Sequence, residues 1–130
     1  MALIIVRFLS ELLYIFVLMR LINIRILQKH LKKNKGNYKL RSEIEKLITS
    51  IQTANWSKPE QIKKDRPDAD RVHPDGFYFF NISVDRTMVL IELDEEEATI
   101  VWCGNHSEYI TTFKNNKSTI RKWLKSKNWI

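Results

Sequence analysis

The residues best suited to chemistry lie together in one short stretch, Gly104-Asn105-His106-Ser107-Glu108-Tyr109. This stretch directly follows an apolar run from Thr99 to Cys103 that is typical of a buried strand. A histidine, a carboxylate and a phenol within four residues are side chains that proteins use for proton transfer. An imidazole exists in both protonation states near neutral pH, so His106 is the natural acid or base of the group. We therefore expect an acid–base site where the strand ends.

The charge of the chain is divided by position and suggests a substrate. The formal net charge is +7. Residues 20–46 hold nine Lys or Arg against two Glu, and residues 111–130 hold six against no acidic residue. Residues 47–110 hold six basic and twelve acidic residues. Two basic blocks that flank an acidic middle favour binding to a polyanion, although a merely solvated surface would have the same composition.

Length and composition set the class of protein. A chain of 130 residues is expected to form one domain with a modest core. Three glycines and three prolines argue against disorder and against repeats. The single cysteine, Cys103, lies in the apolar run, so we expect a core residue in a reducing, cytoplasmic compartment. Nothing in the sequence suggests a disulfide or a Cys/His metal site.

Two helices are predicted after a short strand at residues 20–24. The first is a basic helix over residues 26–34. The second is the stronger prediction because its apolar residues share one face. These are Leu40, Ile44, Leu47, Ile48 and Ile51.

Three strand-like runs follow, at residues 76–83, 87–94 and 98–104, and their short polar turns predict an antiparallel meander. Residues 57–76 hold all three prolines and are expected to be mostly loop, with a helical turn after Ser57 because Ser57-Lys58-Pro59-Glu60 resembles an N-capped start. We predict an α+β fold, in which a small antiparallel sheet packs against two N-terminal helices. A further basic helix is expected from Lys117 to Trp129.

The first eighteen residues are almost wholly apolar and fit three interpretations. They are a short membrane anchor, a helix packed on the domain, or an extension created by placing the start codon too early. Met19-Arg20 begins a segment that reads like an ordinary protein start. We expect residues 1–18 to be such an over-extension, residues 19–113 to be the main domain and residues 114–130 to be a basic C-terminal helix.

Five landmarks, in the right order, resemble the HigB-type toxins of bacterial toxin–antitoxin pairs, which belong to the RelE-like superfamily. The landmarks are Met19-Arg20-Leu21-Ile22, Ala54-Asn55-Trp56-Ser57-Lys58-Pro59-Glu60-Gln61-Ile62-Lys63, Asp68-Ala69-Asp70, Phe79-Phe80-Asn81-Ile82 and Gly104-Asn105-His106-Ser107-Glu108-Tyr109. The resemblance covers about residues 19–110 and favours Met19 as the start.

The resemblance implies the toxin of a type II toxin–antitoxin system, acting as an mRNA interferase that is usually ribosome-dependent. It also implies a partner antitoxin with a helix-turn-helix domain. Such endoribonucleases use neither a metal nor another cofactor. They activate the RNA 2′-hydroxyl to attack the adjacent phosphate, so the protein must supply a base, an acid and cations.

Within that mechanism, His106 is expected to act as general base or acid. Tyr109 is expected to stack on an RNA base or to assist proton transfer, and Glu108 to orient His106 or to bind a lysine. Phosphate contacts are expected from basic residues by type and context. These are Arg86, Lys63 and Lys64, with Arg121 and Lys122 of the C-terminal helix as further RNA contacts.

Two departures from the family pattern keep other functions open. Family members commonly carry an arginine where this chain has Met88, and another where it has Val101. Arg86 lies two residues before Met88 on the same strand face and is a candidate substitute. The chain is thus an active nuclease or a weakened member that serves as a nucleic-acid-binding or protein-interaction module. A membrane-associated protein is the third alternative, and it depends on residues 1–18 alone.

Overall fold

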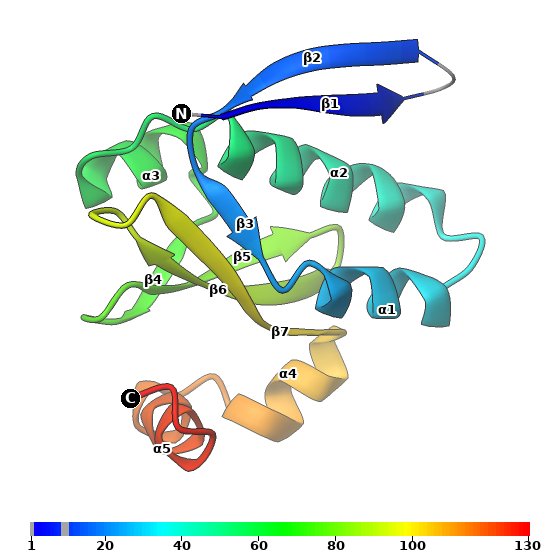
Figure 1. Ribbon diagram of the computed structural model, residues 1–130. Helices are drawn as coiled ribbons and strands as arrows, with labels where there is room; N and C mark the ends of the chain where they lie inside the picture. The colour runs from blue at the N-terminus through cyan, green and yellow to red at the C-terminus, as the bar shows by residue number, and fades with distance from the viewer. Residues whose placement is uncertain (1, 9–10) are drawn as a thin grey trace.

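The computed structural model describes residues 2–8 and 11–130, with side chains from Leu18 onward (Figure 1). Within this part of the chain, an α+β fold combines a five-stranded mixed sheet, a two-stranded sheet and five helices. The elements are β1 (Ala2–Phe8), β2 (Glu11–Val17), β3 (Arg20–Ile22), α1 (Arg25–Lys33), α2 (Tyr38–Gln52), α3 (Pro59–Asp65), β4 (Asp70–His73), β5 (Phe77–Ile82), β6 (Asp85–Glu92), β7 (Glu97–Gly104), α4 (His106–Phe113) and α5 (Lys117–Ser126).

The larger sheet has the strand order β3-β7-β6-β5-β4. Strands β5, β6 and β7 are antiparallel neighbours, which confirms the predicted meander. The prediction of a wholly antiparallel sheet is wrong, because β3 pairs parallel to β7, with Leu21 opposite Ala98. Parallel neighbours need a long crossover. Here the crossover runs through three helices and the other three strands of the sheet.

Residues 57–76 contain more regular structure than predicted. Helix α3 begins with Pro59 at its first turn, and its N-cap is Lys58 instead of Ser57. The Gln61 side chain accepts the backbone N–H groups of both Ser57 and Lys58. Strand β4 then pairs antiparallel with β5 at the edge of the sheet. Aspartate and proline are depleted in strands, so the composition of this segment concealed a four-residue edge strand.

Helices α1, α2 and α3 cover one face of the sheet (Figure 1). The predicted apolar face of α2 is confirmed, because four of its five residues are buried and Ile48 packs against them. The sheet meets them with Tyr78, Phe80, Ile82, Val89, Ile91, Ala98 and Ile100. Trp56 joins this core, and its indole N–H donates to Asp65 at 2.9 Å.

Helices α4 and α5 cover the opposite face, so the domain has three layers where two were predicted (Figure 1). This second core is rich in aromatic side chains. Its buried members are Val72, Phe77, Phe79, Met88, Val101, Tyr109, Phe113, Ile120 and Leu124. The physical reason is the composition of the meander, since a sheet with apolar side chains on both faces needs cover on both.

In the described part of the first eighteen residues, the chain forms two strands, β1 and β2, where two of the three interpretations expected a helix. Strand β1 pairs antiparallel with β2, with Ile5 opposite Tyr14. No helix in the described part of the chain is long and apolar enough to cross a membrane. Met19 is buried, and its backbone N–H donates to the carbonyl of Gln52 at the end of α2. Whether residues 1–18 are an over-extension stays a prediction.

Candidate active site

The stretch from Gly104 to Tyr109 carries the chain from the end of β7 into α4. Asn105 is the N-cap of α4, and its side-chain oxygen accepts the backbone N–H of Glu108 at 2.8 Å. In return the Glu108 carboxylate accepts the backbone N–H of Asn105 at 2.9 Å. This reciprocal pair is a capping box, which satisfies two backbone donors that a helix start leaves free. Glu108 therefore caps a helix, and the predicted contact with His106 or a lysine is not among its hydrogen bonds in the described part.

His106 is the first residue of α4 and is exposed to solvent. Its ring lies nearly parallel to that of Tyr109, with centroids 6.5 Å apart. A group at this position is accessible to a polymeric substrate, and the start of a helix favours negative charge near it. The cap thus presents His106 where a phosphate can approach.

Tyr109 is buried in the second core, so the predicted stacking on an RNA base does not fit its position. Its ring meets Phe79 edge to face, with centroids 5.0 Å apart. Its hydroxyl donates to the side-chain oxygen of Asn115 at 2.9 Å. The guanidinium carbon of Arg86 lies 4.4 Å from its ring centroid, a cation–π contact. Tyr109 therefore holds Arg86 in place.

Arg86 and the histidine stretch lie at the same end of the sheet. In the register of β6 and β7, Arg86 pairs with Gly104. Glycine is needed there because a Cβ would lie 2.6 Å from the Trp102 ring and 3.2 Å from the Cβ of Glu108. The structure thus brings together Arg86, His106, Glu108 and Tyr109, four of the predicted site residues.

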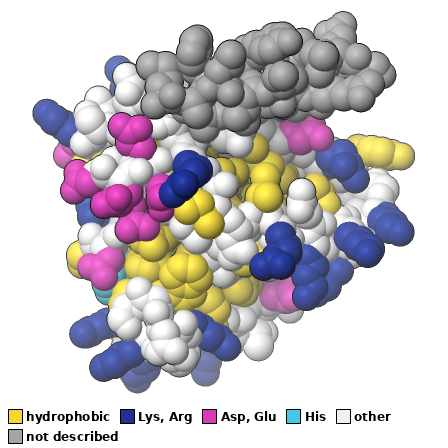
Figure 2. All heavy atoms as spheres, viewed as in Figure 1, with side chains coloured by type: hydrophobic (Ala, Val, Ile, Leu, Met, Phe, Trp, Pro, Cys, Tyr) yellow, Lys and Arg dark blue, Asp and Glu magenta, His cyan; other side chains and the backbone are white. Residues whose placement is uncertain are grey.

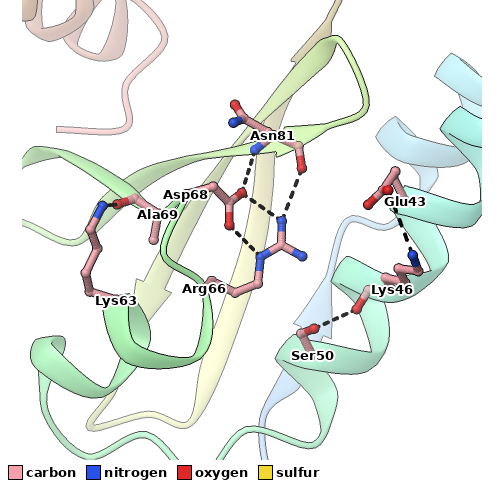
Figure 3. A network of polar contacts seen from close by, with 8 residues as sticks. All are labelled: Glu43, Lys46, Ser50, Lys63, Arg66, Asp68, Ala69 and Asn81. Carbon is pink, nitrogen blue, oxygen red and sulfur yellow. Dashed lines mark hydrogen bonds and ion pairs between the residues drawn. The ribbon is translucent and has the colours of Figure 1, made fainter.

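Lys63 and Lys64 do not join this group. They lie on α3, whose Ile62 packs in the core on the opposite face of the sheet from Tyr109. The ammonium group of Lys63 donates to the backbone carbonyl of Ala69 at 2.9 Å (Figure 3). These two lysines are placed with the α3 side of the domain, away from the layer that holds α4.

A polar network next to α3 is structural. Nε and Nη2 of Arg66 donate to the two oxygens of the Asp68 carboxylate, at 2.8 and 2.7 Å, and the same carboxylate accepts the backbone N–H of Asn81 at 2.9 Å (Figure 3). Burial opposes ionisation of Asp68, but the hydrogen bonds from Arg66 and Asn81 outweigh it and lower the pKa of this carboxyl below its usual value. The network fixes the loop between α3 and β4 to the end of β5.

Arg121 and Lys122 are exposed on α5, which packs beside α4 on the second core. In Figure 2, Lys and Arg side chains gather over α1 and over α5, whereas acidic side chains gather around the turn between β6 and β7. The two basic blocks of the sequence therefore form two separate basic surfaces. The acidic turn lies at the other end of β7 from His106.

Met88 and Val101 occupy the two positions where the family pattern has arginines. Both are buried in the second core, beneath α4 and α5. Val101 lies at a register shift between β6 and β7, where Met88 pairs with Trp102 and Val89 pairs with Ile100. The apolar side chains of α5 thus cover the part of the sheet where the family pattern has its two arginines. Arg86, on β6, lies at the same end of the sheet as His106 and carries a positive charge there.

A buried histidine–aspartate pair escaped the sequence analysis. Nε2 of His30, on α1, lies 2.8 Å from a carboxylate oxygen of Asp85, on β6. Both residues are 7% exposed. They are 55 positions apart in the sequence, so no local spacing of residues predicts that they pair. The signal that existed was a histidine on the inner side of a basic helix, four residues after the apolar Ile26.

A cavity of about 450 Å³ opens between α1, the end of β7 and the start of α4. It is lined by Ile26, Lys29, His30, Lys33, Asn34, Val101, Trp102, Cys103, Asn105 and Glu108. Burial, with the negative charges of Asp85 and Glu108, raises the pKa of the Cys103 thiol to about 12, so this cysteine is no nucleophile. In the described part of the chain, no group of three or more His, Cys, Asp or Glu side chains is placed to hold a metal ion.

The fold and this site define a small α+β protein with an exposed histidine and basic surfaces suited to a polyanion. A family model described as "HigB_toxin, RelE-like toxic component of a toxin-antitoxin system" matches residues 40–111, more than half of the chain. The chain belongs to the HigB toxin family, as its landmarks predicted. Membership assigns it the toxin role and implies an antitoxin partner. No curated protein matches the chain.

Proposed function

We propose that the chain is an endoribonuclease toxin that cleaves mRNA through attack of the 2′-hydroxyl on the adjacent phosphate, without a metal or other cofactor. The substrate is mRNA on the ribosome, and the inhibitor is an antitoxin with a helix-turn-helix domain. One observation carries the proposal. An exposed histidine, His106, begins α4 at the end of the sheet where Arg86 lies. The guanidinium carbon of Arg86 is held 4.4 Å from the centroid of the Tyr109 ring.

In this mechanism His106 acts as the general base or the general acid, and Arg86 neutralises negative charge on the phosphate. Tyr109 positions Arg86 through the cation–π contact with its ring, and Glu108 stabilises the first turn of α4 through the capping box. Arg121 and Lys122, exposed on α5, extend the contact to more distant phosphates of the RNA. Lys63 and Lys64 serve a different surface, since they lie with the helices of the opposite sheet face.

Inducible expression tests the proposal. The full chain is expected to arrest growth, and His106→Ala to abolish the arrest at equal protein level, because an exposed first-turn residue is replaced with little cost to the fold. Ser107→Ala, next to it and also exposed, is the matched control and is expected to remain toxic. Arrest that persists in His106→Ala would remove His106 from the site.

A second function is favoured by Met88 and Val101. Their burial under α4 and α5 leaves apolar side chains where the family pattern has cations. Loss of such a cation costs about a hundredfold or more in rate. The chain is then a nucleic-acid-binding or protein-interaction module that kept the fold. RNA binding without cleavage, by wild type and His106→Ala alike, distinguishes this function from the first.

A further inference from the structure

The cavity beside α1 has the features of a built site for a charged ligand. Its volume of about 450 Å³ is within the range of small-molecule sites. Three elements form it, since α1 supplies one wall, the end of β7 the floor, and the start of α4 the other wall. Asn105 belongs to that last wall and immediately precedes His106, so the cavity borders the candidate active site.

The buried pair at this cavity is arranged for proton exchange. Nε2 of His30 faces the Asp85 carboxylate, which can only accept a hydrogen bond, so in the neutral imidazole Nδ1 is the nitrogen with the lone pair. Every buried side-chain nitrogen and oxygen in the described residues has a hydrogen-bond partner. Nδ1 of His30 makes no hydrogen bond within those residues, so solvent reaches this atom, and His30 lines the cavity. A carboxylate in this position holds the imidazole of a histidine in one tautomer and one orientation.

The charges around His30 favour an anion. Lys29 and Lys33, four residues apart on one side of α1, both line the cavity. The amides of Asn34 and Asn105 line it as well. Its acidic lining residue, Glu108, already accepts a hydrogen bond from Asn105, and Cys103 remains a neutral thiol.

We propose that this cavity binds a phosphodiester of the RNA between Lys29 and Lys33, and that His30, positioned by Asp85, is the proton acceptor for the ribose 2′-hydroxyl. The inference rests on the proposed ribonuclease function and adds a second histidine to its site. Nδ1 of His30 takes the hydroxyl proton while the 2′-oxygen bonds to phosphorus. The bond from phosphorus to the 5′-oxygen breaks, and protonated His106 gives that oxygen its proton. The products are a 2′,3′-cyclic phosphate and a 5′-hydroxyl.

The first test measures binding of the full chain to a short fluorescent 2′-O-methyl oligoribonucleotide, which cannot be cleaved by this route. Lys29→Ala/Lys33→Ala is expected to weaken binding about tenfold or more. Lys32→Ala/Lys35→Ala removes the same charge from the same region, but neither residue lines the cavity. This control is expected to weaken binding several-fold less. Equal losses in the two double variants would mean that only the general positive charge of residues 29–35 matters, and would overturn the phosphate site.

The second test measures the pH–rate profile of mRNA cleavage on ribosomes. His30→Gln keeps an N–H for Asp85 but has no basic nitrogen, so cleavage is expected to fall about a hundredfold or more. The acidic limb of the profile, which reports an essential base, is expected to disappear. Asp85→Asn keeps the shape of the pair without its charge and is expected to shift that limb. Circular dichroism and thermal unfolding are the controls that check whether both variants are folded.

The outcomes separate this inference from the function on which it rests. If wild type cleaves RNA and His30→Gln cleaves at the same rate with the same pH profile, the role of His30 is refuted while the ribonuclease function stands. If wild type does not cleave RNA at all, the function fails and the proton transfer by His30 fails with it. The binding comparison then still decides whether the cavity holds a phosphate.

Discussion

The capping box at the start of α4 gives the sharpest prediction, because it separates a structural carboxylate from a catalytic one. Asn105→Ala removes the acceptor for the Glu108 backbone N–H, a bond of 2.8 Å. Losing an N-cap of this kind costs about 1 kcal/mol. Glu108→Ala removes the reciprocal bond of 2.9 Å, worth about 0.5 to 1 kcal/mol at this exposed position. Since the two bonds satisfy different donors, the double variant is expected to lose about 1.5 to 2 kcal/mol.

Glu108→Gln tests the same carboxylate without breaking the cap. The amide oxygen of glutamine still accepts the Asn105 N–H, so the free energy of unfolding is expected to change by less than about 0.5 kcal/mol. Cleavage activity is expected to stay within about threefold, as no proton passes through Glu108. Urea unfolding measures stability, with Ser107→Ala as the control at an exposed neighbouring position. A fall in cleavage of more than about tenfold at unchanged stability would refute the structural role of Glu108.

Three further predictions test other parts of the fold. Leu124→Ala is expected to cost about 2 to 5 kcal/mol because Leu124 is 0% exposed in the second core, whereas Ile110→Ala, at 42% exposure, is expected to cost clearly less in the same urea unfolding experiment. Cys103 is expected to resist alkylation by iodoacetamide at pH 8 in the folded protein and to react on unfolding, since its pKa is raised to about 12. The hydrogen bonds from Arg66 and Asn81 hold the pKa of the Asp68 carboxyl below its usual value in the folded state. Its contribution to stability is therefore present above the pKa of the unfolded state and is lost as the pH falls through the folded-state pKa. Asp68→Asn is expected to flatten this acid limb of stability, measured by thermal unfolding at acidic pH.

The parts of the fold that sequence predicted depend on local periodicity. The apolar face of α2 and the alternation along β5 and β6 are properties of neighbouring residues, and the structure confirms them. The histidine stretch was also recognisable, and so was the family. The capping box could have been predicted, because an Asn followed three residues later by Glu is its signature, here Asn105 and Glu108.

The parts that escaped prediction depend on pairing between distant segments. The parallel contact of β3 with β7 joins Leu21 to Ala98, and neither strand alone indicates a parallel neighbour. The second helix layer depends on how α5 folds back over Met88. The His30–Asp85 pair is of the same kind, since each residue looks ordinary in its own segment and acquires a role when α1 packs against the sheet.

The central claim is that His106 serves a metal-independent cleavage of mRNA, and the chemistry of the RNA ends tests it most directly. After induction of the full chain, mapping of cellular RNA is expected to find new fragments with 5′-hydroxyl and 2′,3′-cyclic phosphate ends. Cells with equal amounts of His106→Ala are expected to lack them. New ends that are absent in both, or that appear equally in both, would contradict the account.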